Sequence, residues 1–329
     1  MQAPEFWHSD RPAAKAWAAM LSPLGAVYGL SVRARLLTAK PFRASARVIC
    51  VGNLTTGGAG KTQVALALGR MLMARGKKIV FLSRGYGGRL AGPVEVDPKH
   101  HSAVDVGDEP LLLAAKARTV VARNRGQGAK LADALGAQII VMDDGHQNFQ
   151  LAKDLSLVAV DASRGMGNGR LIPAGPLRER VADGLARADA LVLVGHGQPE
   201  LPPFDGPVLR VHATTVAPGA LKGQVLFAFA GIANPDRFFD LLQMTGAHLT
   251  GCQIFADHHP YTAQEISALK LAADRLNARL VTTEKDFVRL DLDQSDRITP
   301  VPVRAAFEDE AAIGSLLDRL DELRAERSA

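Results

Sequence analysis

The sequence predicts an α/β protein: a parallel sheet sandwiched by helices, followed by a second, smaller α/β domain. Short apolar runs alternate with helical stretches between Arg47 and Val194, and a second series of the same kind begins at Val225. Strands that are apolar along their whole length are typical of parallel sheets covered by helices on both faces. In such sheets ligands bind at the carboxyl ends of the strands, so the polar residues that follow each strand are candidates for a binding site.

The composition agrees with this fold class and limits the function. The chain has 329 residues, of which 47% are hydrophobic and 22% charged, which excludes a disordered protein and is enough for two domains. The formal net charge of +5 fits an anionic partner and leaves a nucleotide, an anionic lipid surface and a nucleic acid open. Cys50 and Cys252 are the only cysteines. No disulfide framework is therefore expected, and a reducing cytoplasm is the default compartment.

Residues 1–46 differ from the rest of the chain because a long uncharged run is followed by a cluster of basic residues. Between Lys15 and Arg33 the chain carries no charge, and Pro23 and two glycines interrupt this run. Its length is near the lower limit for a membrane span. Basic residues then cluster from Arg33 to Arg47. This pattern favours a membrane-associating helical segment on an anionic leaflet, peripheral or shallowly inserted, whereas the alternative is a buried helix that covers the core.

A glycine-rich turn organises the first domain, which we place at residues 47–205. The apolar run Arg47–Gly52 enters the turn, and Val64–Leu72 leaves it as a helix. This is the arrangement of a phosphate-binding P-loop, in which backbone N–H groups and a helix N-terminus surround phosphate oxygens. Thr55 stands where the usual motif has its first glycine. The residues expected to bind the nucleotide are Thr55, Thr56, Gly57, Gly58, Ala59, Gly60, Lys61 and Thr62.

Two residues of this turn and two aspartates downstream predict how the phosphates are handled. A P-loop lysine reaches the β- and γ-phosphates, and the hydroxyl that follows it binds Mg²⁺, which gives Lys61 and Thr62 their expected roles. Asp143 and Asp144 follow a buried strand, in the position of a Walker B carboxylate. The alternative is that they only turn the chain. Together the two motifs predict a P-loop NTPase-like fold.

The second half is expected to form a linker and a smaller domain. Residues 206–224 are predicted to be the linker because this stretch is rich in proline and glycine. Residues 225–329 are predicted to form an α/β domain that closes over the nucleotide cleft. Thr262 and Glu265 form a capping box that begins a helix, and residues 308–327 have the pattern of an amphipathic terminal helix.

Three further positions are ambiguous from their residues alone. Asp108 either caps a helix or is the carboxylate that a kinase needs near its acceptor hydroxyl. His258, which is followed by His259, is compatible with a capping role as well as with catalysis. Lys285 lies at a strand end and either contacts a phosphate or is an ordinary surface lysine.

Missing motifs narrow the class of nucleotide-binding protein. A regulatory GTPase needs Asn-Lys-x-Asp, and the chain contains no Lys-x-Asp. Switch ATPases with a signature lysine in the loop would carry it just before Gly57, where this chain has Thr56. Both absences favour a metabolic kinase. The alternative is a P-loop switch or assembly ATPase that acts on a protein partner.

Motifs along nearly the whole chain resemble, in the same order, those of the tetraacyldisaccharide 4′-kinases, the lipid A 4′-kinase family. The long run 164–179 is especially specific, and Thr55 belongs to the normal pattern of this family. The matching stretches are Pro4–Trp7, Gly52–Thr62, Ser83–Gly87, Gly107–Pro110, Asp143–Gln147, Arg164–Glu179, Asp257–His259 and Thr283–Asp286.

The resemblance implies a kinase that transfers the γ-phosphate of ATP to the 4′-hydroxyl of tetraacyldisaccharide 1-phosphate, which forms lipid IVA. It implies ATP and Mg²⁺ as cofactors and a place at the cytoplasmic face of the bacterial inner membrane. The implied partners are the lipid A disaccharide 1-phosphate precursor and the inner-membrane lipid surface. No nucleic acid and no obligate protein partner are expected.

The resemblance also implies roles for single residues. Asp108 resembles the catalytic base of the family, assisted by His258 rather than His259, and Lys61 is catalytic as well. Asn148 departs from the histidine that many members carry there, and an amide cannot titrate near neutral pH. The expected Mg²⁺ ligands are Thr62, Asp143 and Asp144, and the expected substrate contacts are Arg170, Arg178 and Lys285.

Overall fold

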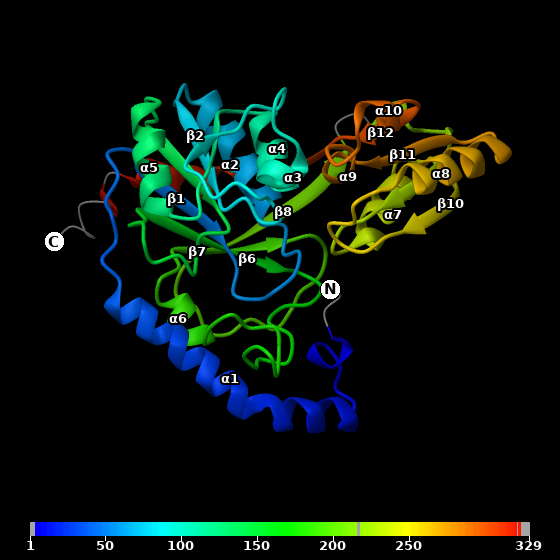
Figure 1. The fold of residues 1–329 in the computed structure, drawn as a ribbon. Coiled ribbons are helices and arrows are strands. Elements are labelled where there is room, and N and C mark those ends of the chain that lie inside the picture. Colours follow the sequence, from blue (N-terminus) through cyan, green and yellow to red (C-terminus); the bar gives the residue numbers. More distant parts are fainter. Residues whose placement is uncertain (1–3, 216–217, 321, 324–329) are drawn as a thin grey trace.

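Two α/β units make up the chain, one built on a nine-stranded sheet and the other on a four-stranded sheet. The computed structural model describes residues 4–215, 218–320 and 322–323. In Figure 1 the smaller unit lies beside the larger one, and helix α1 runs along the outside of the larger unit. The predicted fold class, a mostly parallel sheet sandwiched by helices with a smaller α/β unit, is confirmed.

The larger sheet has the strand order β13-β8-β7-β6-β1-β5-β2-β4-β3. Its strands run parallel from β8 to β4, and the edge strands β13 and β3 pair antiparallel. Since β1 lies between β6 and β5, the residues that follow these three strands meet at one edge of the sheet. The strands are β1 (Arg47–Gly52), β2 (Ile79–Ser83), β3 (Val94–Glu95), β4 (Thr119–Val121), β5 (Ile139–Asp143), β6 (Leu155–Asp161), β7 (Ala190–Val194), β8 (Val208–Thr215) and β13 (Val303–Phe307).

Helices cover both faces of this sheet, because successive residues of each apolar strand point to opposite sides. Ile49 of β1 packs in a buried cluster with α2 (Lys61–Ala74) and α11 (Glu310–Asp318). Cys50 packs on the other face with α5 (Arg125–Ala134). The shorter helices of this unit are α3 (Ala103–Val106), α4 (Asp108–Ala114) and α6 (Val181–Leu185).

The smaller unit has a parallel sheet with the order β10-β9-β11-β12. The predicted capping box is confirmed: Thr262 Oγ1 accepts a hydrogen bond from the Glu265 N–H at 3.2 Å, and the Glu265 carboxylate accepts one from the Thr262 N–H at 2.9 Å. The elements are β9 (Val225–Ala230), β10 (His248–Ile254), β11 (Arg279–Thr283), β12 (Ile298–Val301), η2 (Pro218–Ala220), α7 (Pro235–Met244), α8 (Ala263–Arg275), α9 (Glu284–Phe287) and α10 (Leu292–Ser295).

The expected unit boundaries need two corrections. Residues 206–224, expected as a linker, contain β8, which pairs with β7 inside the larger sheet. Residues 225–329, expected in the smaller domain, end with β13 and α11, which return to the larger unit. β13 pairs with β8, and Arg70 of α2 donates a hydrogen bond to the Ala305 carbonyl. The chain therefore crosses between the units twice, which local composition does not reveal. The last part of the expected terminal helix, 324–327, lies outside the described residues.

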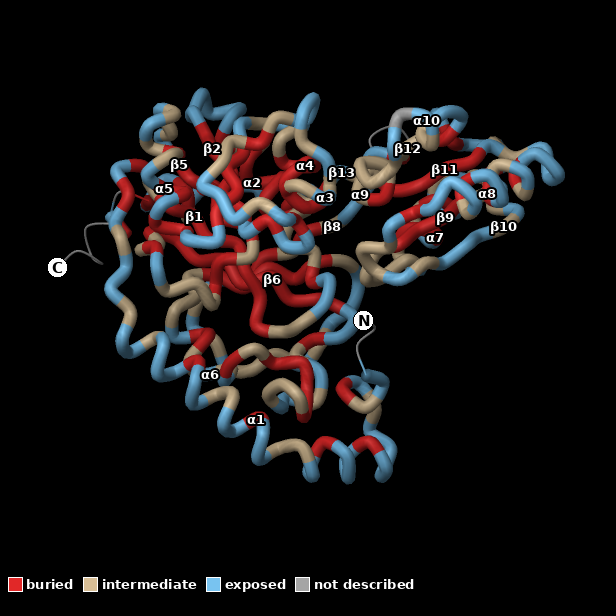
Figure 2. Tube along the Cα trace, in the orientation of Figure 1, coloured by how far each residue is buried: buried red, intermediate tan, exposed pale blue. Residues whose placement is uncertain are grey.

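Helix α1 (Pro12–Thr38) packs on the larger unit through few of its residues. Gly25 lies against Leu171, whose carbonyl oxygen would be 3.0 Å from an added Cβ at this position. The preceding η1 (Glu5–Trp7) is anchored by Trp7, whose Nε1 donates to the Pro173 carbonyl at 3.0 Å. Figure 2 shows long exposed stretches of α1. Among the described helices, none combines the length and apolar character needed to cross a bilayer.

The packing of α11 gives a prediction about stability. Ile313 of α11 is fully buried in the cluster of the larger unit. Replacing Ile313 by Ala should lower the free energy of unfolding by about 2–5 kcal/mol, because the deletion leaves a cavity. Urea denaturation followed by circular dichroism measures this. The control Leu271→Ala, at an exposed position of α8, should change it by less than about 0.5 kcal/mol. Equal effects would contradict the assignment of α11 to this core.

Candidate functional site

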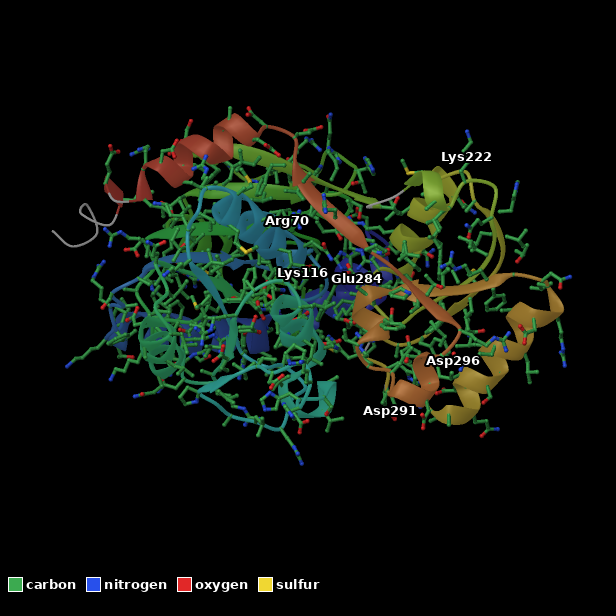
Figure 3. All side chains as sticks on the ribbon, turned by 90° about the horizontal axis from the view of Figure 1, so that it is seen from above. Arg70, Lys116, Lys222, Glu284, Asp291 and Asp296 are labelled. Atoms are coloured by element: carbon green, nitrogen blue, oxygen red, sulfur yellow. The ribbon has the colours of Figure 1, made fainter. Side chains whose placement is uncertain are left out.

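The carboxyl ends of the two sheets meet at the junction between the units. The loops after β1 and β6 and the start of α4 in the larger unit contact the segments after β9, β10 and β11 in the smaller one. Ala233, after β9, sits so close to Gly58 that an added Cβ there would lie 2.6 Å from the Ala233 Cβ. Arg237 of α7 contacts Asp161, the last residue of β6, at 2.5 Å. Figure 3 shows Lys116 and Glu284 close together at the same junction, where their charged atoms are 3.3 Å apart.

The glycine-rich loop joins β1 to the N-terminus of α2. Gly60 immediately precedes the helix with φ of +77°, a backbone conformation that favours glycine. The Thr56 N–H donates to the Pro176 carbonyl at 2.8 Å, so the long motif 164–179 supports the loop from one side. Because α2 begins directly at Lys61, its free N–H groups and positive dipole end lie at the loop.

Lys61 and Thr62 meet the two aspartates that follow β5. The Thr62 hydroxyl donates to Asp143 Oδ2 at 2.9 Å, and the Lys61 ammonium lies 3.6 Å from Asp144 Oδ1. Arg178 contacts the same Asp144 oxygen at 2.9 Å. Asp143 is fully buried, and its Oδ1 has no hydrogen-bond partner among the described residues. A buried carboxylate oxygen without a partner, beside a threonine hydroxyl, is a fitting place for a divalent cation.

The two aspartates differ in their electrostatics. Burial raises the pKa of Asp143, and the negative charge of Glu109 adds to this effect. Burial also opposes ionisation of Asp144, but the charges of Lys61 and Arg178 outweigh it and lower the pKa of Asp144. Asp144 is therefore neutralised by protein cations, whereas Asp143 still needs a positive partner.

Asp108 begins α4 of the larger unit, but residues of the smaller unit hold its side chain. His258, in the loop after β10, lies with Nδ1 at 2.9 Å from Asp108 Oδ2. Arg289 donates to the same oxygen through Nε at 2.8 Å. Both Asp108 and Arg289 are almost fully buried. Burial by itself would raise the pKa of Asp108, but the hydrogen bond with His258 and the charges of Lys285 and Arg289 lower it well below its usual value.

Lys285 completes this cluster, and His259 does not belong to it. The Lys285 ammonium lies 3.4 Å from Glu109, 3.5 Å from Asp257 and 3.4 Å from His258 Nε2. Burial is the largest single influence and by itself would lower the pKa of Lys285. The surrounding carboxylates together outweigh it and raise this pKa. The ring of His259 instead contacts Glu265 at 3.0 Å. The geometry thus separates the two histidines that the sequence left side by side.

The expected substrate residues do not all gather at this junction. Lys285 does, whereas Arg178 contacts Asp144 beside the glycine-rich loop and Arg170 bonds to the Ser22 hydroxyl of α1. Sequence reasoning also missed Arg237 and Arg289, two residues of the smaller unit that form ion pairs with aspartates of the larger unit. Arg289 offered one local signal: it lies three residues after Asp286, and the two side chains pair at 2.8 Å.

Comparisons with known proteins agree with this geometry. A family model described as tetraacyldisaccharide-1-P 4′-kinase matches residues 17–321. A protein named tetraacyldisaccharide 4′-kinase from Rhodospirillum rubrum is 48% identical over 97% of this chain and 98% of its own length. One of the same name from Parvibaculum lavamentivorans is 52% identical over 88% of this chain and 87% of its own.

A solved structure has the same fold. The crystal structure of LpxK from Aquifex aeolicus in complex with ATP has a TM-score of 0.75 and 26% sequence identity, and the match covers 92% of this chain and 99% of that one. The chain belongs to the tetraacyldisaccharide-1-P 4′-kinase family.

Proposed function

We propose that the chain is an ATP-dependent kinase that transfers the γ-phosphate to the 4′-hydroxyl of tetraacyldisaccharide 1-phosphate and so forms lipid IVA. One observation carries the proposal: a glycine-rich loop with Lys61 and a buried acid, Asp108, that is paired with His258 belong to one electrostatic site. The charges of Glu109 and Lys61 both affect the pKa of Asp143, which links the glycine-rich loop to the Asp108–His258 pair. A switch ATPase that acts on a protein partner has no need for such a pair.

The loop residues 55–62 are proposed to hold the phosphates of ATP. Their N–H groups and the α2 dipole face the negative charge, and Lys61 neutralises charge that develops on the transferred phosphoryl group. Mg²⁺ would supply further neutralisation of the phosphate charge. Thr62 and Asp143 are the proposed protein ligands, and Asp144 is proposed to act through water because Lys61 and Arg178 already occupy it.

Asp108 is proposed to accept the proton of the acceptor hydroxyl. The 4′-oxygen forms a bond to the γ-phosphorus while the bond from that phosphorus to the leaving ADP oxygen breaks, and the hydroxyl proton moves to Asp108. Because its pKa is lowered, Asp108 is a weak base. It therefore takes the proton late, when the new bond has made the hydroxyl acidic. His258 and Arg289 orient the carboxylate. Lys285 and Arg178 are proposed to contact a phosphate group of one of the two substrates, ATP or the acceptor.

Helix α1 is proposed to bring the enzyme to its lipid substrate at the cytoplasmic face of the inner membrane. Large apolar side chains form an exposed stripe on it: Trp17, Met20, Leu24, Val27, Leu30 and Leu37. The exposed fraction is 56% at Trp17 and 66% at Val27, which is costly unless another apolar phase covers them. A substrate with four acyl chains stays in a bilayer, so shallow insertion of this stripe would give access to it.

A transfer assay tests the proposed activity. Protein incubated with γ-labelled ATP, Mg²⁺ and detergent-dispersed tetraacyldisaccharide 1-phosphate should place label on the lipid. Excess EDTA should abolish the transfer, because Thr62 and Asp143 then lack the cation. ATP hydrolysis stimulated by a protein, without labelled lipid, would instead support the switch ATPase.

Replacing Asp108 by Asn should lower kcat about 10²–10⁴-fold, the usual weight of a general base. The KM for ATP should change little, because Asp108 is proposed to act on the acceptor hydroxyl rather than on ATP. Steady-state kinetics measures both values. A nearly normal kcat would remove Asp108 from this role.

Replacing Lys61 by Ala should lower kcat/KM for ATP by about a hundredfold or more. The substitution removes the positive charge that neutralises the transferred phosphoryl group. The matched control Lys270→Ala, on α8, should keep normal kinetics. Circular dichroism should show both variants folded. Undiminished turnover of Lys61→Ala would overturn the assignment of the loop.

Replacing Trp17, Leu24 and Val27 together by Ser should weaken co-sedimentation with anionic vesicles, because apolar area that enters the bilayer is lost. The thermal midpoint should stay unchanged, since all three side chains are exposed. A control with Leu271→Ser on α8 should bind normally. Vesicle binding equal to that of the parent protein would refute the role of the stripe.

A further inference from the structure

A second buried carboxylate lies behind Asp108, on the other side of Arg289. It belongs to Asp286 of α9, which is fully buried. The guanidinium of Arg289 joins the two acids: its Nη1 donates to Asp286 Oδ1 at 2.8 Å, and its Nε donates to Asp108 Oδ2 at 2.8 Å. Two buried anions from different units therefore share one buried cation, and none of the roles proposed above uses Asp286.

Hydrogen-bond donors from several elements hold the Asp286 carboxylate in one orientation. Besides the bond from Arg289, Oδ1 accepts hydrogen bonds from the Tyr261 hydroxyl at 2.7 Å and from the Gly231 N–H at 3.0 Å. Oδ2 accepts one from the Thr283 hydroxyl at 2.6 Å. Burial and the negative charge of Asp286 raise the pKa of Tyr261, so its hydroxyl stays a donor. A buried carboxylate with donors on both oxygens has little freedom to turn.

Gly231, which follows β9, ties Asp286 to both partners of Asp108. Its N–H donates to Asp286, while its carbonyl oxygen accepts from Arg289 Nη1 at 2.8 Å and from the His258 N–H at 3.2 Å. The backbone of His258 has φ of +61°, which is unfavourable for a residue with a side chain and has to be held by such contacts. Asp286 thus lies behind both residues that the smaller unit presents to Asp108.

The same contacts decide which oxygen of Asp108 is open to the acceptor. Oδ2 is engaged by Arg289 and by His258. In the part of the chain that the structure describes, Oδ1 accepts one hydrogen bond, from the Glu109 N–H at 2.9 Å. Since a carboxylate oxygen has two lone pairs, Oδ1 keeps one for a substrate hydroxyl. The planar guanidinium of Arg289 fixes this orientation, because it binds Asp108 along one edge and Asp286 at its other end.

We propose that Asp286 is a positioning residue for the transfer: through Arg289 and Gly231 it holds Asp108 so that Oδ1 takes the proton of the acceptor hydroxyl. The inference rests on the proposed function, in which Asp108 is the base. Asp286 itself takes no proton and touches no substrate, because it is fully buried behind Arg289. Burying a charged pair costs more free energy than burying apolar side chains of the same volume, so stability alone does not account for Asp286.

Kinetics of the variant D286N tests this. Asn keeps the size of the side chain but loses the charge that holds Arg289. The kcat of the transfer should fall about tenfold to a hundredfold, because a small displacement of a catalytic group is costly. The KM values for ATP and for the acceptor should stay unchanged. The matched control L242A removes a fully buried side chain of the same unit and should lower the thermal midpoint while leaving kcat at the parent value.

A double-mutant cycle with Asp108 separates positioning from a structural role. Because Asp286 acts through Asp108, D286N should not lower the residual kcat of D108N any further. An equal loss in D108N and in the parent protein would show that the effect bypasses Asp108, and this would overturn the inference. A parent-like kcat of D286N would overturn it too. If the parent protein transfers no phosphate to the acceptor, the proposed function is wrong and the inference falls with it.

A milder variant provides a second test in case D286N does not fold. Y261F keeps the ring in its apolar cluster and removes the hydroxyl that donates to Asp286. It should lower kcat about twofold to tenfold, the weight of one hydrogen bond, again without further loss in D108N. An unchanged kcat of Y261F would then count against the role of Asp286 and overturn the inference. Circular dichroism and thermal midpoints check that each variant is folded.

Discussion

A buried carboxylate held from two sides is the interaction on which this structure depends. Asp108 belongs to the larger unit, but its partners His258 and Arg289 come from the smaller one. A carboxylate buried in this way is tolerated only with cationic or hydrogen-bonding partners. The two units therefore have to meet for Asp108 to be stable as an anion. The same contact brings Lys285 to Glu109, so the acid–histidine cluster exists only at the junction.

The strand order decides which charges can meet there. β1 lies at the centre of the larger sheet, with β5 and β6 on either side. Its glycine-rich loop is therefore adjacent to Asp143 and Asp144 on one side and to Asp161 on the other. Lys61 and Arg178 neutralise Asp144, and Arg237 neutralises Asp161. Of these three aspartates, in the part of the chain that the structure describes, Asp143 is the one with a buried oxygen that has no protein partner. This difference between neighbouring carboxylates is what makes the place suitable for a cation and phosphates.

Helix α1 is packed on the larger unit but leaves its large apolar side chains exposed to the surroundings of the protein. It is attached through small residues such as Gly25, which let the helix approach Leu171 closely, while its large apolar side chains stay exposed. A helix in a soluble core would show the opposite distribution. Its basic end, with Arg35 and Lys40, lines a cavity together with the N-terminus of α5 and residues 147–150.

The residue pattern alone predicts the class of the fold, the glycine-rich loop and the aspartate pair. These are local features: apolar runs, glycines at a turn and polar residues at strand ends act within a few residues of one another. It also named Asp108 and His258, largely by resemblance to a family. The fold adds what these patterns do not show: β8, β13 and α11 complete the larger unit, Arg170 lies against α1, and Arg289 holds Asp108. It also separated His258 from His259. The physical reason is that these outcomes depend on pairing and charge compensation between residues as far apart as Asp108 and Arg289, and no local pattern encodes which buried charge meets which partner.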